Sequence, residues 1–325
     1  MKKKVAIITG GNVAEREVSL KSAKTIHKHL NKNRFDSYIV ELNGNIFRET
    51  ESDSLIDMND FSLSVPQKEK INFDYIFLML HGHPAEDGCI QGYLQLLNIP
   101  FTGCDQFVSG LTFNKQVCKD YLRPFGIPMA KSELIYKSEK FNEESIQHLG
   151  LPLFVKPNKN GSSYGVTKVK KLTELQAAIE KSFQFDEEVI IEQFMEGREF
   201  SNGVVRKGKE LIVMPVTEII SDNDFFDFKA KYENQSQEIT PADLSPELTK
   251  QVQDLSIKLY QVLNCKGLVR FDSILVKDTF HFIEANTIPG FSEQSIFPQQ
   301  AIAHGWTITE LLDCVMDEMI DTQAS

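Results

Sequence analysis

The sequence predicts a mixed α/β (α+β) fold that begins with a small doubly wound domain built on a parallel sheet. Continuous apolar runs at residues 5–9 and 75–80 predict strands that are buried on both faces, as in parallel sheets. A helical pattern lies between them, and the order strand, helix, strand is typical of a doubly wound domain. After Gly103 the pattern changes to helix, loop and strand, so we place a domain boundary there.

The elements of the first hundred residues follow from the spacing of apolar side chains. Residues 5–9 form a strand, and a helix with apolar residues at helical spacing follows the turn at Gly10-Gly11. Residues 38–42 form the next strand. The polar segment 51–72 is either weakly structured or an insertion before the strand at 75–80.

The first turn is not a dinucleotide-binding turn. That fingerprint needs G-x-G-x-x-G after the first strand, and residues 10–15 lack its second and third glycines. A Rossmann dehydrogenase is therefore disfavoured. Glu15 stands at the start of the following helix, where its carboxylate is either a partner of the helix dipole or a receptor for a ligand ammonium group.

Beyond Gly103 the sequence predicts a helix at residues 114–125 and strands at 152–156 and 187–194. The loop at 156–165 is rich in small residues and carries lysines on its rim. It is either an ordinary hairpin turn or a cradle whose N–H and O–H groups bind phosphate.

A second polar loop, at residues 221–245, is long for a connection in a compact domain, and such loops are often lids. Near the C-terminus, residues 308–319 form an amphipathic helix that closes the core.

The bulk composition is that of a soluble globular protein with 325 residues, 41% hydrophobic and 25% charged. The net charge of −11 argues against a broad surface for nucleic acid or anionic membrane. Five scattered cysteines without a CxxC motif predict reduced thiols, and no apolar run reaches the length of a signal-peptide core or a membrane span. We therefore expect a cytoplasmic protein.

A cluster of polar residues near the C-terminus is the strongest candidate site. Glu284 and Asn286 are two apart in an apolar-flanked run, so both side chains leave one face of a strand. Asp272 lies in a preceding strand, 268–276, which can pair with it antiparallel. The set suits Mg²⁺, and Arg270 beside it calls for an intervening anion such as a polyphosphate. A solvated strand edge followed by a turn is the alternative.

The ordered motifs together resemble the D-alanine–D-alanine ligases of the ATP-grasp superfamily over nearly the whole chain. The matching stretches are Gly10-Gly11 with residues 15–20, His81-Gly82 with 86–88, 100–103, 154–157 with 161–163, 192–199, 230–232, 241–244, 267–272, and 284–290 with Ser295.

The resemblance implies an ATP-grasp fold in which two α+β domains hold ATP after the N-terminal domain. It implies boundaries at 1–103, 104–193 and 194–325, with a lid at 221–245 in the last domain. It also implies that ATP phosphorylates one D-alanine and that the amine of a second attacks the acyl phosphate. D-alanyl-D-alanine for peptidoglycan results, and the expected cofactors are ATP and two Mg²⁺ ions, with Mn²⁺ as a substitute. A homodimer is expected, without nucleic-acid or membrane partners.

The resemblance also assigns roles to single residues. The metal ligands are Asp272, Glu284 and Asn286. The ATP-binding residues are Lys115, Lys156, Ser163, Glu192, Phe194, Met195, Glu199 and Lys231. The catalytic residues are Glu15, Ser162, Tyr232, Arg270 and the backbone N–H of Gly290, with Glu15 receiving the ammonium of the first D-alanine. The substrate-binding residues are His81 for the first D-alanine, and Ser295 and Ile296 for the carboxylate of the second.

Tyr232 also bears on the second substrate, because relatives that make D-alanyl-D-lactate carry His or Phe at this position. Tyrosine favours D-alanine. The chain departs from the family pattern at Ala85, Asn114, Phe226 and Phe228. None of these changes removes a predicted metal ligand or phosphate-binding lysine.

Two other functions are compatible with parts of the pattern. A degenerate ATP-grasp protein would bind nucleotide without catalysis, but it is expected to lose a metal ligand or Arg270, and both are present. An ATP-grasp ligase for other carboxylates would lack the pairing of Glu15 with Tyr232.

Overall fold

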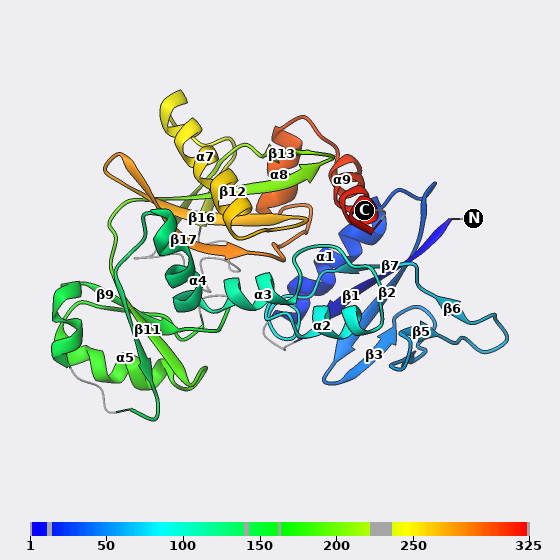
Figure 1. Cartoon of the computed structure of the whole chain (residues 1–325), viewed down its shortest axis with the longest axis horizontal. Helices are drawn as coiled ribbons and strands as arrows, with labels where there is room; N and C mark the ends of the chain where they lie inside the picture. The colour runs from blue at the N-terminus through cyan, green and yellow to red at the C-terminus, as the bar shows by residue number, and fades with distance from the viewer. Residues whose placement is uncertain (1, 12–14, 140–142, 162–163, 222–235, 324–325) are drawn as a thin grey trace.

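The computed structural model describes residues 2–11, 15–139, 143–161, 164–221 and 236–323. They form four sheets with helices packed on and between them (Figure 1).

The first sheet has the parallel core that the apolar runs predict. Its order is β3-β2-β1-β7, and β1 (Lys3–Gly10) pairs in parallel with both β2 (Phe35–Asn43) and β7 (Tyr75–Leu78). β3 (Ile46–Glu49) adds an antiparallel edge strand. Helix α1 (Arg16–His29) packs against β1, as the strand–helix–strand order requires.

The polar segment before β7 is more ordered than its composition suggests. It forms a small antiparallel sheet from β4 (Ile56–Asp57), β5 (Ser62–Leu63) and β6 (Ile71–Asn72). Phe61 anchors it, being fully buried with its ring edge-on to Phe47 at 5.4 Å. A few aromatic residues therefore outweigh the polar composition, because one buried ring removes a large apolar area from water.

The second sheet is antiparallel and has the order β10-β9-β11-β8. Its strands are β8 (Ser132–Tyr136), β9 (Leu153–Pro157), β10 (Thr167–Val169) and β11 (Glu188–Gln193). Helix α5 (Leu175–Ser182) covers it, and its buried side chains share one apolar core with β9 and β11.

The third sheet is built around its longest strand, β12 (Arg198–Lys207), which pairs with β13 (Glu210–Val213), β14 (Thr217–Ser221) and β16 (Val269–Val276). It also contains β15 (Ser236–Ile239) and β17 (Thr279–Asn286). β16 and β17 form an antiparallel hairpin, as predicted, with Lys277 at its turn.

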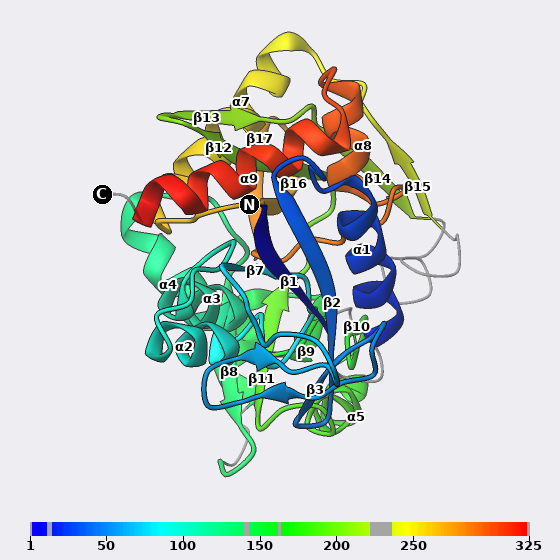
Figure 2. The same ribbon diagram turned by 90° about the vertical axis from the view of Figure 1, so that its right-hand side faces the viewer.

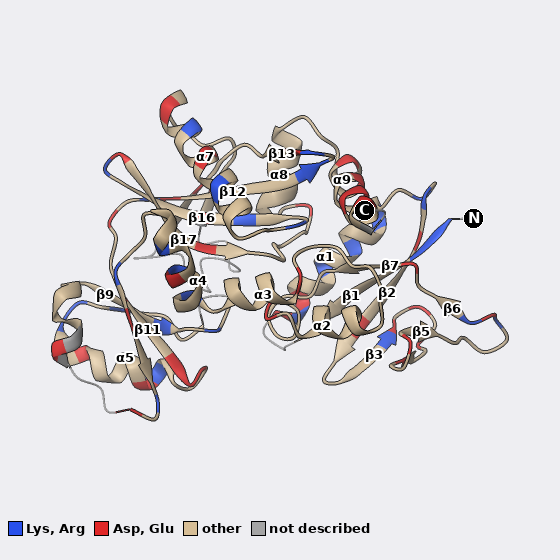
Figure 3. Ribbon diagram, in the orientation of Figure 1, with Lys and Arg blue, Asp and Glu red and all other residues tan. Residues whose placement is uncertain are grey.

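Six more helices complete the described part of the chain. They are α2 (Cys89–Leu96), α3 (Gln106–Phe113), α4 (Lys115–Leu122), α7 (Pro246–Val262), α8 (Ile296–Ala303) and α9 (Ile308–Gln323). Over the residues described, no helix combines the length and the apolar composition needed to cross a membrane. Charged side chains are interspersed over α4, α7 and α9, whereas α2, α3 and α8 contain no Lys, Arg, Asp or Glu (Figure 3).

The apolar cores join segments that are distant in the sequence. Val108 of α3 and Leu122 of α4 share a core with Phe282 of the third sheet. Phe297 of α8 and Leu312 of α9 belong to the core of the first sheet. Figure 2 shows α9 lying across the molecule beside β1, β2 and the start of the chain. The C-terminal helices therefore tie the first sheet to the third.

We expect the substitution Leu312→Ala to lower the free energy of unfolding by about 2–5 kcal/mol, because it leaves a cavity in this shared core. Leu312 has no exposed surface, whereas Ile302, also near the C-terminus, is 52% exposed and provides the control Ile302→Ala. Urea denaturation of both variants measures the difference. Equal losses in the two variants would contradict the packing of α9 described above.

Candidate active site

A cavity of about 180 Å³ lies where the loops of the first, second and third sheets meet. Nine of the residues selected from the sequence line it, namely Glu15, His81, Lys115, Arg270, Glu284, Asn286, Gly290, Ser295 and Ile296. They come from the start of α1, the loop after β7, the start of α4, the β16–β17 hairpin and the segment before α8. The cavity therefore gathers positive, negative and hydrogen-bonding groups from segments that are far apart in the sequence.

Glu15 is held between two glycines. It is the N-cap residue of α1, but its side chain makes no capping hydrogen bond. A Cβ atom at Gly82 would lie 2.6 Å from Glu15 Oε2, and one at Gly161 would lie 3.0 Å from Oε1. Gly82 also has a φ of +72°, which favours glycine. The two loops thus leave room for the carboxylate only because both positions lack a side chain.

His81 is oriented by the backbone of the segment after β17. Its Nδ1 lies 2.9 Å from the carbonyl oxygen of Ile288, so Nδ1 carries the proton and donates it. The Oγ of Ser19 accepts the His81 backbone N–H at 3.0 Å. The other ring nitrogen, Nε2, is buried and has no hydrogen-bond partner among the described residues. In this tautomer Nε2 is a buried acceptor on a residue that lines the cavity.

The β16–β17 hairpin brings the predicted metal ligands together. Arg270 lies opposite Asn286, and Asp272 lies opposite Glu284. The register shifts by one residue immediately after Asp272, which marks a β-bulge at this point. All four side chains therefore leave one face of the hairpin at its open end.

Arg270 lies directly against Asp272, with no group between them. Its Nε and Nη2 donate to Oδ1 and Oδ2 of Asp272 at 3.0 and 2.9 Å. Asp272 also accepts hydrogen bonds from Ser201 Oγ at 2.6 Å and from Asn286 Nδ2 at 2.9 Å. Burial by itself would lower the pKa of Arg270. The Asp272 carboxylate raises it by more than burial lowers it, so the pKa of Arg270 lies above its ordinary value. The sequence predicts an anion between Arg270 and the metal site, and in the structure the Asp272 carboxylate itself neutralises Arg270.

These residues fit a hard divalent cation. Asp272 and Glu284 supply carboxylate oxygens from facing positions, and Asn286 supplies an amide oxygen once its side chain turns. Asp272 is only 4% exposed and is already held by three donors, which fixes its orientation. The donor set contains oxygen only, which suits Mg²⁺ or Mn²⁺ better than a soft metal.

Lys115 reaches the cavity from the first turn of α4. Its Nζ donates to the carbonyl oxygen of Asn160 at 2.7 Å. Burial lowers the pKa of Lys115, while the carboxylates of Glu284, Glu192 and Glu86 oppose that change and the cation of Lys156 adds to it.

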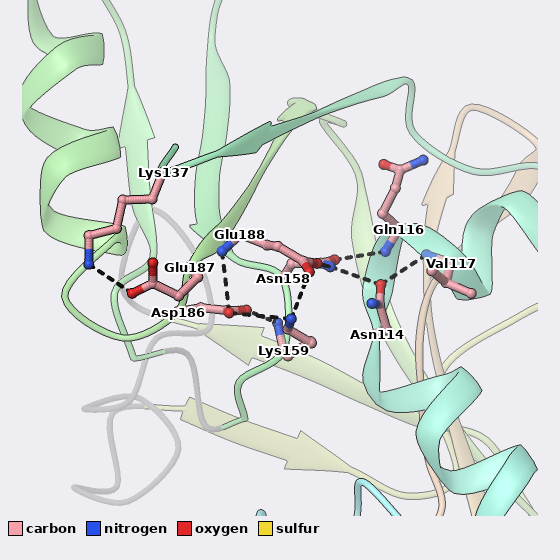
Figure 4. A network of polar contacts seen from close by, with 9 residues as sticks. All are labelled: Asn114, Gln116, Val117, Lys137, Asn158, Lys159, Asp186, Glu187 and Glu188. Atoms are coloured by element: carbon pink, nitrogen blue, oxygen red, sulfur yellow. Dashed lines mark hydrogen bonds and ion pairs between the residues drawn. The ribbon is translucent and has the colours of Figure 1, made fainter. Parts of the chain in front are cut away.

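The position of Lys115 depends on a buried asparagine in the following loop. Asn158 is fully buried, and its Nδ2 donates to Asn114 Oδ1 at 2.8 Å and to Glu188 Oε2 at 2.6 Å (Figure 4). Its side-chain oxygen accepts the N–H of Gln116, and its backbone oxygen accepts the N–H of Lys115. Asn158 therefore fixes the N-terminus of α4 on the end of β9.

Glu192 stands between two lysines beside this network. Its Oε2 lies 2.6 Å from Nζ of Lys156, and its Oε1 accepts a hydrogen bond from Nζ of Lys119 at 2.7 Å. Burial alone would raise the pKa of Glu192, but the two ammonium groups lower it to about 2. The carboxylate is therefore ionised at any physiological pH.

The remaining residues predicted to bind ATP lie outside the lining of the cavity. Phe194 packs on Phe154 with ring centroids 5.6 Å apart, and Lys168 Nζ lies 3.9 Å from the Phe194 ring centroid. Met195 is half-buried beside it, and Glu199 is on β12 opposite Ile274 of β16. They follow Glu192 along the chain and form the junction between the second and third sheets.

The segment before α8 offers backbone donors. Ser295 is the N-cap of this helix, and its side chain makes no capping hydrogen bond but accepts the N–H of Ser292 at 3.0 Å. The N–H groups at the start of α8, including that of Ile296, are therefore available to an anion. A Cβ atom at Gly290 would lie 3.3 Å from Ser295 Oγ, so the two are close neighbours.

Four selected residues, Ser162, Ser163, Lys231 and Tyr232, lie outside the described residues, as do Phe226 and Phe228. Two residues of the site were not predicted from the sequence: Lys119, and Asn158, which hydrogen-bonds to the start of α4 and to Glu188. Lys119 had a signal, since it follows Lys115 by four residues in a predicted helix and so shares its face. Asn158 had no comparable signal, because a buried hub depends on contacts with Gln116 and Glu188.

Two family models match most of the chain. The model described as D-ala D-ala ligase N-terminus matches residues 4–104, and the model described as D-ala D-ala ligase C-terminus matches residues 122–317. The chain is 44% identical to the D-alanine–D-alanine ligase of Flavobacterium johnsoniae, over 95% of this chain and 97% of that protein. It is 42% identical to that of Phocaeicola vulgatus, over 98% and 99% of the two chains.

Solved structures with similar folds include two ligases. The VanG D-Ala:D-Ser ligase from Enterococcus faecalis has a TM-score of 0.86 at 33% identity, over 98% of this chain and 100% of that chain. The D-alanine–D-alanine ligase from Bacillus anthracis, complexed with ATP, has a TM-score of 0.82 at 28% identity, over 99% of each chain.

We expect Asn158→Ala to lower the free energy of unfolding by about 2–3 kcal/mol, because it leaves buried polar groups of α4 and Glu188 without partners. The exposed Asn33 provides the control Asn33→Ala, with a loss below about 0.5 kcal/mol. Denaturant titrations measure both. If Asn158→Ala loses as little stability as the control, then the hydrogen bonds of Asn158 do not hold the start of α4 on the end of β9.

Proposed function

The chain belongs to the D-alanine–D-alanine ligase family, and we infer that it joins two D-alanines into D-alanyl-D-alanine with ATP, for peptidoglycan synthesis. ATP phosphorylates the carboxylate of the first D-alanine, and the amine of the second D-alanine displaces the phosphate. The products are the dipeptide, ADP and phosphate.

One observation supports this proposal most directly. The cavity is lined by the acid Glu15, by Arg270 and Glu284 of the β16–β17 hairpin, and by Lys115 of α4. The ammonium group of an amino acid needs a carboxylate such as Glu15, and the negative charge of a phosphoryl group needs cations such as Arg270 and Lys115. A protein that only bound nucleotide would have no use for the Glu15 carboxylate in this cavity.

We propose that Glu15 and His81 bind the first D-alanine. An ammonium group has three donors, and the Glu15 carboxylate and the His81 Nε2 are acceptors on residues that line the cavity. The ammonium group would thus be oriented by Glu15 and His81, leaving the carboxylate to face Arg270 and Lys115. This orientation brings the reacting oxygen toward the phosphoryl group.

The phosphate groups of ATP are assigned to Lys115 and Lys156, with Glu192, Phe194, Met195 and Glu199 along the nucleoside. Asp272, Glu284 and Asn286 would hold two Mg²⁺ ions, for which Mn²⁺ is a substitute. When bound, these ions would neutralise the phosphate oxygens. Arg270 is charged in this arrangement, since the adjacent Asp272 carboxylate raises its pKa.

The second D-alanine is assigned to the end of the cavity at Ser295 and Ile296. The N–H groups at the start of α8 suit its carboxylate. Its attack gives a tetrahedral oxyanion, and Arg270 with the backbone N–H of Gly290 would stabilise that charge. From the sequence alone, Ser162 and Tyr232 would link to Glu15, and Ser163 and Lys231 would contact the phosphates.

The proposal extends to the domains of the chain, its cellular location and its quaternary structure. The three large sheets correspond to functional domains at 1–103, 104–193 and 194–325. The enzyme acts in the cytoplasm, where ATP is supplied. Its quaternary structure is a homodimer, and it needs neither nucleic acid nor membrane.

A coupled assay of ADP release, combined with mass analysis of the product, tests the function. We expect ADP and D-alanyl-D-alanine in equal amounts with D-alanine, ATP and Mg²⁺, and no turnover after chelation of the metal. D-Lactate, D-serine and L-alanine are offered alone and paired with D-alanine. Absence of ADP release with D-alanine at millimolar concentration would refute the proposal, and a dominant D-alanyl-D-serine product would reassign the second substrate.

ATP binding should weaken on the alkaline side because Lys115 loses its charge. Burial lowers the pKa of Lys115 below its ordinary value of 10.5, so the ammonium form that binds phosphate disappears earlier as the pH rises. Lys115→Arg keeps its charge, since the guanidinium pKa is above about 12. We expect this variant to shift the alkaline decline of ATP affinity, measured by calorimetry without D-alanine, to higher pH. An unshifted decline would remove Lys115 from the phosphate site.

A further inference from the structure

Lys119, Glu192 and Lys156 form a buried triad of two cations and one carboxylate, of which only Lys156 is assigned to the phosphates. Lys119 is 3% exposed and Glu192 is 9% exposed, and each oxygen of Glu192 faces one ammonium group, at 2.7 and 2.6 Å. The ATP-binding roles proposed above involve Lys156 and Glu192. They leave Lys119 without a function.

The three residues come from two paired strands of the second sheet and from a helix outside it. Lys156 on β9 and Glu192 on β11 lie on one face of the second sheet, because Lys156 pairs with Ile190, two positions before Glu192. Lys119 comes from α4, four residues after Lys115 and on the same face of that helix. The Asn158 network fixes the start of α4 (Figure 4), so Lys119 is held against Glu192 from outside the sheet.

This arrangement matters when Lys156 turns from Glu192 to a phosphate. A carboxylate left alone in a buried site is strongly unfavourable, because its desolvation is no longer compensated. With Lys119 in place, Glu192 keeps one ion pair at 2.7 Å after Lys156 has left. Without Lys119, every molecule of ATP that recruits Lys156 would strand a buried negative charge.

We propose that Lys119 is a positioning residue for ATP binding, which keeps Glu192 paired and so releases Lys156 to the phosphates. The inference rests on the proposed function, since it needs Lys156 as a phosphate ligand. The alternative is a brace that only fastens α4 to the second sheet.

ATP dissociation constants from calorimetry, with kcat and KM for ATP, distinguish the two roles. We expect Lys119→Met to weaken ATP binding by about tenfold or more and to raise KM for ATP, with kcat changed by less than about threefold. In the background of Glu192→Gln, where no carboxylate is stranded, the same substitution should weaken ATP binding by less than about threefold. Lys119→Arg, which preserves the charge, should restore most of the affinity.

Lys137→Met is the matched control, because the Lys137–Glu187 pair adjoins the ends of β8 and β11 on the surface, with the lysine side chain 48% exposed. We expect no change in ATP affinity there. If Lys119→Met melts below the assay temperature, Lys119→Gln replaces it, with the same expected loss.

The outcomes separate this inference from the proposed function. Equal losses for Lys119→Met with and without the Glu192→Gln substitution, or a loss below about threefold in both cases, would overturn the positioning role. If Lys156→Met also binds ATP as tightly as the unmodified enzyme, the assignment of Lys156 to phosphate fails as well. If Lys156→Met weakens binding and Lys119→Met does not, only the inference fails.

Discussion

Antiparallel pairing of β16 with β17 is the constraint on which the site depends. Its register places Arg270 opposite Asn286 and Asp272 opposite Glu284. The regular pairing is interrupted by a bulge immediately after Asp272, next to these four residues. A slip of β17 by one residue would turn Glu284 and Asn286 to the face opposite Arg270 and Asp272, which β12 holds in register. The ion pair of Arg270 with Asp272 also holds both side chains in place, because two charges this deeply buried are tolerated only in contact.

Charge is balanced locally throughout the site. Asp272 neutralises Arg270, and Glu192 is shared by Lys119 and Lys156. Each pairing keeps a buried group ionised, because an opposite charge in contact offsets its desolvation. Lys156 and Asn286 must still turn from these partners before they can bind a ligand, so the pairing holds the charges in the site without fixing their final orientation. The chain achieves this pairing despite a net charge of −11, because local pairs rather than bulk charge set the field.

Much of the fold could be anticipated from apolar patterning, and the exceptions have physical causes. The parallel strands at β1, β2 and β7 were predicted because runs buried on both faces are continuous. Helices α2 and α3 were not, since each has eight residues and a glycine inside it, which weakens the helical signal. The small sheet β4–β6 was hidden by polar composition, although Phe61 anchors it.

The sequence by itself determined the kinds of groups in the site and their order, because a metal needs oxygen ligands, a phosphate needs cations, and Glu284 and Asn286 share a face through the period of a strand. Only the tertiary structure decided which groups touch. It placed Glu15 between Gly82 and Gly161, paired Arg270 directly with Asp272, and brought Lys119 to Glu192 across 73 residues of chain. The physical reason is that periodicity acts within one element, whereas a buried ion pair depends on how separate elements pack.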